Sequence, residues 1–201
     1  MTLRYRALQC LALLFVTTGL HAQRLSPAGE EALYARALGF THKDSLKAAV
    51  RALERAVKTS VEPARTYFRI GRLNAKLERS DEAIRAFRRA IQADGELAEA
   101  HAGLGVVFLD LKNDWKGALP HLRAAVALDS TDAAAQYHLA RVYVRAGRQE
   151  AKKAAARALK LDPAYAPPYL LLAELYEEER LDNKREFAAV LEETATHMPV
   201  R

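Results

Sequence analysis

The sequence predicts an all-α fold, a solenoid in which antiparallel helix pairs stack in series. Strong helix formers (alanine, leucine, arginine and glutamate) recur along all 201 residues. No stretch alternates apolar and polar residues for long enough to indicate a strand. A pattern of small and apolar residues also returns every 33 to 35 residues. Because half the residues are apolar, we expect a folded core and not a disordered chain.

The first 22 residues have the three-part layout of a secretory signal peptide. Arg4 and Arg6 form a short basic region, residues 7–20 are apolar and uncharged, and Ala22 ends a plausible peptidase site. The apolar run is shorter than the roughly 20 residues that cross a bilayer as a helix. We therefore expect cleavage after Ala22, a periplasmic or secreted protein, and no stable membrane span afterwards. An uncleaved anchor and a short core helix are the alternatives.

Cleavage would also change the thiol content and the charge of the protein. Cys10 is the only cysteine and lies inside the apolar run, so the mature chain would carry no thiol, which suits an oxidising compartment. Loss of Arg4 and Arg6 leaves 29 basic and 25 acidic side chains, a formal charge of +4. A small positive charge spread along helices favours a solvated surface over a nucleic-acid interface.

The first helix pair of the mature chain is marked by helix-start residues. Ser26 and Pro27 supply an N-cap and a proline at the first helical position, and they predict a helix that extends to Leu38. A partner helix is expected over about 44–59. The small and apolar positions of the helix that ends at Leu38 match the repeat poorly, so we interpret residues 23–63 as a degenerate first pair.

Two sets of positions carry the repeat. In the first helix of each unit an apolar residue precedes a small one, at Ile70-Gly71, Leu104-Gly105, Leu139-Ala140 and Leu172-Ala173. Three residues beyond each pair lie Asn74, Phe108, Tyr143 and Tyr176. In the second helix a small residue recurs at Ala49, Ala83, Ala118 and Ala151. All these positions shift together, and the one-residue differences fall in the turn within a unit, where they disturb packing least.

At these residues the chain resembles the tetratricopeptide-repeat family, whose unit is an antiparallel helix pair with small residues at these positions. The resemblance implies a right-handed superhelix of about four to five repeats. It covers residues 64–163 as three well-matched units and residues 164–201 as a last helix pair that ends in a capping helix. The expected pairs are 64–77 with 80–93, 98–111 with 115–128, 133–145 with 148–161, and 166–180 with 184–197.

Motifs that would carry catalysis or bind a cofactor are absent from the sequence. The five histidines that remain after cleavage lack metal-ligand spacing. There is no glycine-rich phosphate loop and no GxSxG elbow. We therefore expect a protein that is not an enzyme and that needs no metal or cofactor.

The family resemblance implies that a partner binds on the concave face, which the first helices line. Transferred onto this chain, the groove positions are Arg65, Phe68, Arg72, Lys76, Val106, Leu109, Tyr137, Arg141, Arg145 and Glu174. Because several of these side chains are basic, we expect a protein or peptide partner that has an acidic or carboxylate-bearing segment. The alternative is that these charges only keep the surface solvated.

The expected function is therefore that of a non-catalytic scaffold or adaptor that binds a polypeptide segment. A non-catalytic subunit of an envelope assembly or secretion complex is an alternative. An RNA-binding helical repeat is a further alternative, but the export signal and the small charge disfavour it. We expect no nucleic-acid partner, and the sequence leaves the oligomeric state open.

Overall fold

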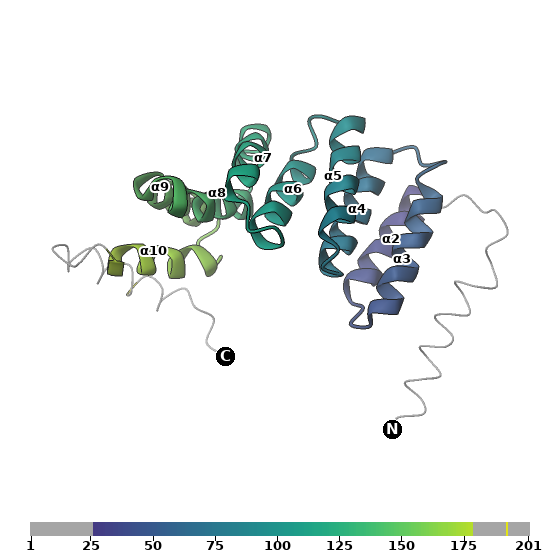
Figure 1. The fold of residues 1–201 in the computed structure, drawn as a ribbon, viewed down its shortest axis with the longest axis horizontal. Helices are drawn as coiled ribbons and strands as arrows, with labels where there is room; N and C mark the ends of the chain where they lie inside the picture. The colour runs from purple at the N-terminus through teal and green to yellow at the C-terminus, as the bar shows by residue number, and fades with distance from the viewer. Residues whose placement is uncertain (1–25, 179–191, 193–201) are drawn as a thin grey trace, which may run out of the picture.

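The computed structural model describes residues 26–178 and residue 192. The predicted signal peptide lies outside the described residues, and so does the predicted last helix over 184–197 except for residue 192. In the described part, helices follow one another as antiparallel pairs that stand in a row (Figure 1). This confirms the predicted all-α solenoid. The division of the chain into domains stays a prediction.

The described helices form four complete pairs and the first helix of a further pair. The pairs are α2 (Pro27–Leu38) with α3 (Lys43–Ala56), α4 (Pro63–Lys76) with α5 (Ser80–Ala93), α6 (Ala98–Asp110) with α7 (Trp115–Leu128), and α8 (Ala133–Ala146) with α9 (Arg148–Leu161); α10 (Pro167–Glu178) follows. Side chains cap several helix starts. Ser26 Oγ accepts a hydrogen bond from Gly29 N at 3.1 Å, as its position before Pro27 predicts.

The small residues of the repeat allow helices to approach closely. A Cβ atom added to Gly71 would lie 2.7 Å from Phe87 Cε1, and one added to Gly105 would lie 2.5 Å from Leu122 Cγ. Ala83, in the matching position of a second helix, is completely buried. A larger side chain at these positions would force the paired helices apart. The repeat of small residues therefore reflects the need for close contact between the helices.

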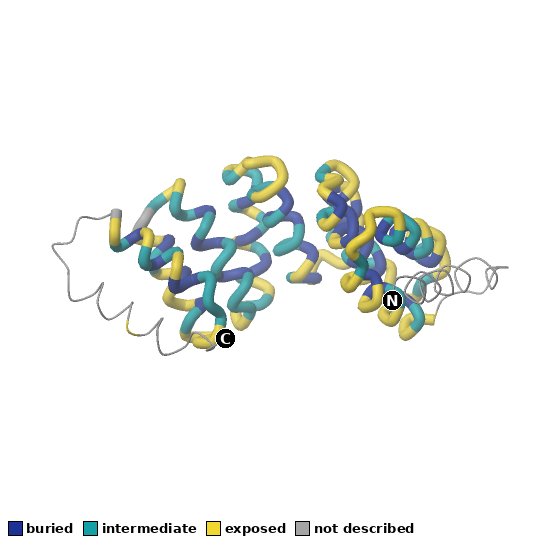
Figure 2. The backbone as a smooth tube through the Cα atoms, turned by 90° about the horizontal axis from the view of Figure 1, so that it is seen from below, coloured by how far each residue is buried: buried dark blue, intermediate teal, exposed yellow. Residues whose placement is uncertain are grey.

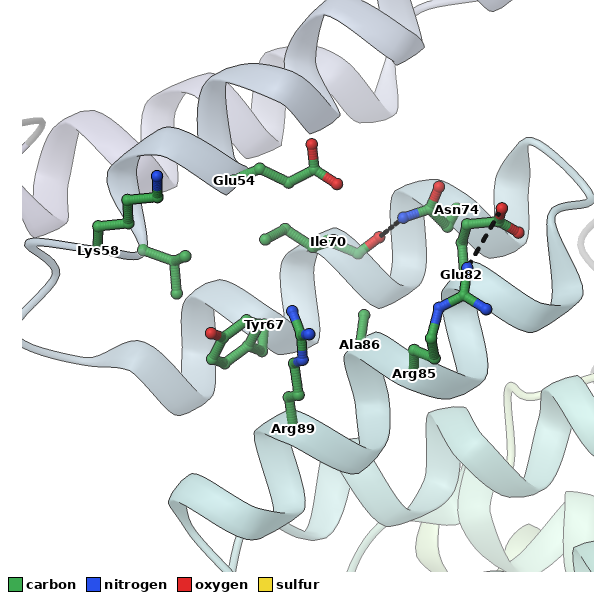
Figure 3. A pocket seen from close by; sticks show the side chains of 10 residues that line it. Glu54, Lys58, Tyr67, Ile70, Asn74, Glu82, Arg85, Ala86 and Arg89 are labelled. Carbon is green, nitrogen blue, oxygen red and sulfur yellow. Dashed lines mark hydrogen bonds and ion pairs between the residues drawn. The ribbon is translucent and has the colours of Figure 1, made fainter.

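The stacking has an inner and an outer row. The first helices α2, α4, α6, α8 and α10 contact one another in sequence, whereas no second helix contacts another second helix in the described part. Figure 3 shows α4 between α3 and α5, which stand apart on either side of it. Buried segments follow one another along the stack, with exposed turns at its edges (Figure 2). The first helices therefore form a continuous shared face.

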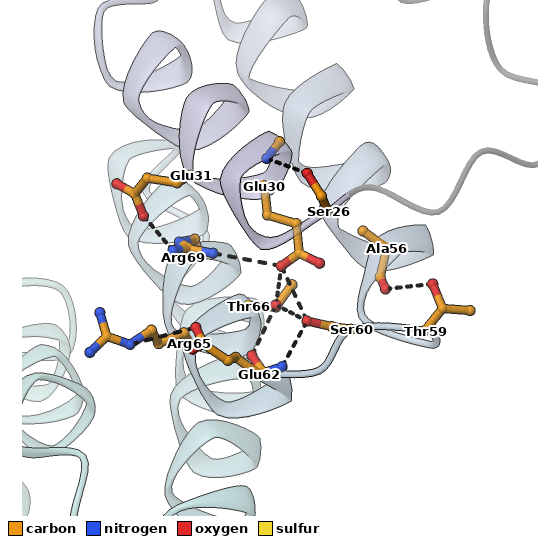
Figure 4. Close-up of polar contacts among 11 residues, drawn as sticks. Ser26, Glu30, Glu31, Ala56, Thr59, Ser60, Glu62, Arg65, Thr66 and Arg69 are labelled. Carbon is orange, nitrogen blue, oxygen red and sulfur yellow. Dashed lines mark hydrogen bonds and ion pairs between the residues drawn. The ribbon is translucent and has the colours of Figure 1, made fainter.

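A buried charge cluster holds α2 against α4 (Figure 4). The Glu30 side chain is 1% exposed, and its Oε2 lies 3.6 Å from Arg69 Nη1. The same oxygen accepts hydrogen bonds from Ser60 Oγ at 3.3 Å and from Thr66 Oγ1. Arg69 also pairs with Glu31 at the surface. The first pair, whose first helix matches the repeat poorly, is thus attached by polar contacts in addition to apolar packing.

Removal of Glu30 alone should destabilise the chain strongly. Glu30→Ala leaves the buried Arg69 without its inner counter-charge, and we expect the free energy of unfolding to fall by about 3 kcal/mol. The double variant Glu30→Leu with Arg69→Met should recover most of this loss, because well-packed apolar residues replace a buried ion pair at little cost. Urea denaturation of the variants measures both effects. Glu96→Ala, at an exposed position, is the control and should change the free energy of unfolding little. A loss for Glu30→Ala no larger than that of the control would contradict the expectation.

Candidate functional site

A cavity of about 410 Å³ opens on the shared face of the first helices, between α4, α6 and α8. Its floor is apolar and includes Phe68, Phe87 and Val106. The Phe68 and Phe87 rings lie with centroids 6.0 Å apart and tilted by 50°, a favourable arrangement for two aromatic rings. The cavity therefore offers an apolar surface on a face that is otherwise rich in charge.

Two glycines on neighbouring first helices place the Phe87 ring beneath this cavity. Phe87 belongs to the second helix α5 and is 1% exposed. Its ring reaches between α4 and α6, where an added Cβ would meet it at 2.7 Å from Gly71 and at 2.6 Å from Gly103. The repeat pattern predicts Gly71 as a packing position. It does not predict Gly103, because the equivalent positions of the other units do not hold small residues.

The rim of the cavity carries opposite charges on its two sides. Arg72 is exposed, and its guanidinium carbon lies 5.9 Å from the Phe68 ring centroid. Glu99 and Asp132 line the cavity from α6 and from the start of α8. Asp132 is the N-cap of α8, since its Oδ1 accepts hydrogen bonds from Ala134 N at 2.8 Å and Ala135 N at 3.0 Å. A bound group would therefore meet a cation at one end and carboxylates at the other.

Of the predicted groove residues, this cavity brings together Phe68, Arg72 and Val106. Leu109 is half-buried against the core cluster between α7 and α8. The other predicted residues do not line the cavity, and their part in binding stays a prediction. Asp132 is a rim residue that lies outside the predicted groove positions. Its signal is an aspartate just before an alanine-rich helix start, which is typical of an N-cap.

Several predicted basic residues already have partners within the chain. Arg141 Nη2 lies 2.6 Å from Asp110 Oδ1, and its guanidinium lies over the Tyr137 ring. Burial lowers the pKa of Arg141, but the hydrogen bond and charge of Asp110 more than offset this and raise the pKa above its ordinary value. Lys76 Nζ donates to the Leu38 carbonyl oxygen at the end of α2. These two cations therefore stabilise the stack.

Arg65 and the two remaining charged residues of the predicted groove are more peripheral. Arg65 Nε lies 3.9 Å from Glu62 Oε2 one turn earlier, with both side chains more than half exposed, so this pair adds little stability. Arg145 and Glu174 are exposed on α8 and α10. Within the predicted groove, Arg72 is thus the basic residue that the structure places at the rim of the cavity.

The residues that the structure describes contain no group of three or more histidine, cysteine, aspartate or glutamate side chains that could hold a metal ion. None of the described helices has both the length and the apolar character needed to cross a membrane.

Two histidines, His138 of α8 and His121 of α7, have a pKa below that of free histidine. Burial lowers the pKa of His138, the neighbouring Arg141 lowers it further, and Asp110 and Asp132 partly oppose the shift. Burial also lowers the pKa of His121, with smaller contributions from His101 and Arg88. His121 stacks on Phe108, with ring centroids 5.8 Å apart and planes 2° from parallel. The fold therefore favours the neutral form of both imidazoles.

We expect acid to destabilise the chain through these two histidines. A group whose folded pKa is lowered contributes stability above its unfolded pKa, about 6.5 for histidine, and this stability is lost as the pH falls through the folded value. The free energy of unfolding should therefore fall below about pH 6.5. The double variant His121→Gln with His138→Gln should flatten this dependence between pH 7 and 5, as measured by urea denaturation at each pH. His42→Gln is the exposed control. A slope that the double variant leaves unchanged would contradict the assignment.

Comparison with known proteins gives matches to one family of helical repeats. Residues 64–96 match the family model described as tetratricopeptide repeat. Nothing among the curated proteins matches the chain. The fold is similar to MamA from Desulfovibrio magneticus RS-1, with 22% identity, a TM-score of 0.68, and coverage of 84% of this chain and 92% of that one.

Two further solved structures share the fold, one described by a peptide-binding site and the other by a bound peptide. YrrB, described as a tetratricopeptide-repeat protein with an unusual peptide-binding site, is 22% identical, with a TM-score of 0.65 and coverage of 86% of this chain and 84% of that one. The first such domain of Spaghetti (RPAP3), bound to an HSP90 peptide, is 22% identical, with a TM-score of 0.55 and coverage of 57% and 91%. The chain thus contains a tetratricopeptide repeat at residues 64–96, and its described part folds as a solenoid of the tetratricopeptide-repeat type.

Proposed function

We propose that this chain is a non-catalytic binding module that holds a segment of another polypeptide on the shared face of its first helices. The observation that carries the proposal is the cavity between α4, α6 and α8, which has an apolar floor and a rim of opposite charges. Its volume of about 410 Å³ falls in the range of about 300–1,000 Å³ that is usual for ligand sites. The cavity is therefore large enough to take a bulky side chain.

The proposed segment has an apolar anchor next to an acidic group. A buried aromatic or aliphatic anchor in a central pocket carries most of the energy in such interfaces. Phe68 and Val106 would contact the anchor. The described residues place no carboxylate within ion-pair distance of Arg72, so this guanidinium can bind an acidic group of the partner. Glu99 and Asp132 on the opposite side would repel the same group and so fix the direction of the segment.

Relatives of the same fold support this kind of partner. The YrrB structure is described by its peptide-binding site and the Spaghetti structure by its bound HSP90 peptide SRMEEVD, which contains several acidic residues. In the present chain the specificity would come from Phe68, Arg72 and Glu99. No set of nucleophile, base and orienting group emerges from the sequence motifs, which supports a role without catalysis.

Peptides selected from a random library against the purified mature chain test the proposal. We expect enrichment of a bulky apolar residue next to aspartate or glutamate. Arg72→Ala should weaken binding of the selected peptides by at least about tenfold in a fluorescence-anisotropy titration, because a charge-assisted hydrogen bond contributes about 1.5–3 kcal/mol. Ala102→Trp, which fills the cavity from α6, should abolish binding.

Arg157→Ala is the matched control for this experiment, because Arg157 is exposed on α9 away from the cavity. Its affinity for the peptides should equal that of the unmodified chain. Equal affinities for Arg72→Ala, Ala102→Trp and Arg157→Ala would refute the assignment of the binding face. Random single-stranded RNA in the same titration should show no specific binding.

We further propose that the module works in the periplasm or outside the cell. The proposal rests on the basic, apolar and small-residue regions of residues 1–22. Fusion of these residues to an alkaline phosphatase without its own signal should give active enzyme, since the phosphatase needs an oxidising compartment for its disulfides. Leu13→Arg, which interrupts the apolar region, should abolish the activity. N-terminal sequencing of the exported chain should begin at Gln23, and retention of the intact fusion in the cytoplasm would contradict export.

A further inference from the structure

A second cavity, of about 320 Å³, lies on a different face of α4 (Figure 3). Here α4 forms the floor through Tyr67, Ile70 and Asn74, while α3 and α5 form the two walls. The first cavity instead uses Phe68 and Arg72 of α4. Since a helix turns by about 100° per residue, these two sets of side chains point in clearly different directions. The second cavity is therefore separate from the proposed peptide site.

The repeat explains why this cavity is open. Asn74 occupies the position that Phe108, Tyr143 and Tyr176 hold in the later units. There the aromatic ring packs into the interface between one unit and the next: Phe108 contacts the core clusters on both of its sides, and so does Tyr143. Asn74 has a much shorter side chain and belongs to none of these clusters. The unit built on α4 and α5 thus lacks the ring that fills the equivalent space elsewhere.

The arginine that covers the aromatic ring in a later unit is also replaced here. In a later unit, Arg123 of α7 donates from Nε to Tyr143 Oη at 3.0 Å, and its guanidinium carbon lies 5.6 Å from the ring centroid. The equivalent residue on α3, counted from the small residue of each second helix, is Glu54. Glu54 lines the open cavity together with Asn74. Both members of the arginine–tyrosine contact are therefore absent at this place in the stack.

Asn74 itself indicates what kind of group the cavity accepts. Its side chain is 2% exposed, and its Nδ2 donates to the Ile70 carbonyl oxygen at 3.0 Å. Its Oδ1 is buried and has no hydrogen-bond partner. A buried acceptor without a donor destabilises the structure around it, so a ligand that brings a hydrogen-bond donor to this oxygen gains affinity.

The walls and the rim favour an aromatic ring. Val57 of the turn after α3, Ile70 and Ala86 supply apolar surface. Arg89 at the rim already lies over an aromatic ring, with its guanidinium carbon 5.7 Å from the Tyr67 centroid. Lys58 stands on the opposite wall. Cations at the edge of an apolar slot attract the face of an aromatic ring, as the Arg123 and Tyr143 pair does within this chain.

We propose that this cavity binds an aromatic side chain with a hydrogen-bond donor, a tyrosine or a tryptophan, from a second polypeptide. The ring lies between Val57 and Ala86, and its hydroxyl or indole N–H donates to Asn74 Oδ1. The partner thereby supplies the aromatic residue that later units supply from their own first helix. This site is independent of the proposed peptide groove and lies on the outer side of the stack, where second helices stand apart.

Titration of the mature chain with two model compounds tests the proposal. The probes are N-acetyltyrosine amide and N-acetylphenylalanine amide, which differ by one hydroxyl, and binding is followed by NMR chemical-shift changes. We expect the tyrosine probe to bind about tenfold more tightly and to shift the amide signals of Ile70, Asn74 and Ala86. Equal affinity of the two probes, or no binding by either, would overturn the proposal.

Two substitutions at Asn74 separate the roles of shape and hydrogen bond. Asn74→Leu removes the acceptor and should abolish the preference for the tyrosine probe while leaving the phenylalanine probe bound. Asn74→Tyr should fill the cavity from within, raise the thermal midpoint of unfolding and eliminate binding of both probes. Ala102→Trp fills the other cavity and is the control, which should bind the tyrosine probe normally. A preference for tyrosine that survives in Asn74→Leu would overturn the proposed hydrogen bond, whatever becomes of the peptide groove.

Discussion

The close approach of successive helices around a single aromatic ring is the constraint on which this structure depends. Phe87 projects from a second helix into a space bounded by Gly71 of its own unit and Gly103 of the next. Neither helix pair can bury its apolar face alone, so each unit gains its stability from its neighbour. The same ring forms the floor of the candidate groove. Stability and binding therefore share one side chain, and a substitution there would affect both.

Some charged residues of this solenoid form ion pairs that link successive units. Glu30 and Arg69 join α2 to α4 in a nearly dry environment, and Asp110 joins α6 to Arg141 of α8. Both contacts link first helices of successive units. Where the apolar positions of the first pair depart from the repeat, a buried ion pair with two hydroxyl groups holds it in place. A buried ion pair of this kind adds little free energy compared with well-packed apolar residues of similar volume.

The solenoid could be predicted from the sequence because its cause is periodic. Positions such as Gly105 and Ala118 recur at a nearly constant interval, and each recurrence reports the same packing requirement. The charge contacts could not be predicted, because they join residues such as Glu30 and Arg69 that occur only once and share no repeat position. Helix register is enough to place Phe68, Arg72 and Val106 on one face, where they line the same cavity, whereas the sequence does not reveal that Arg141 pairs with Asp110. Pairing between side chains of different units depends on exact rotation of the helices, which a periodic pattern does not encode.

The core of the described chain consists of several small clusters, each of which joins helices that are neighbours or near neighbours in sequence. Closing such short loops takes little chain entropy, so a chain of this kind has low contact order and folds quickly. Each helix pair can pack against the preceding pair as soon as that pair has folded. Folding can therefore propagate along the chain from one end. A protein that emerges gradually through a narrow channel benefits from this property, because no early segment has to wait for a distant one before it can leave the unfolded state.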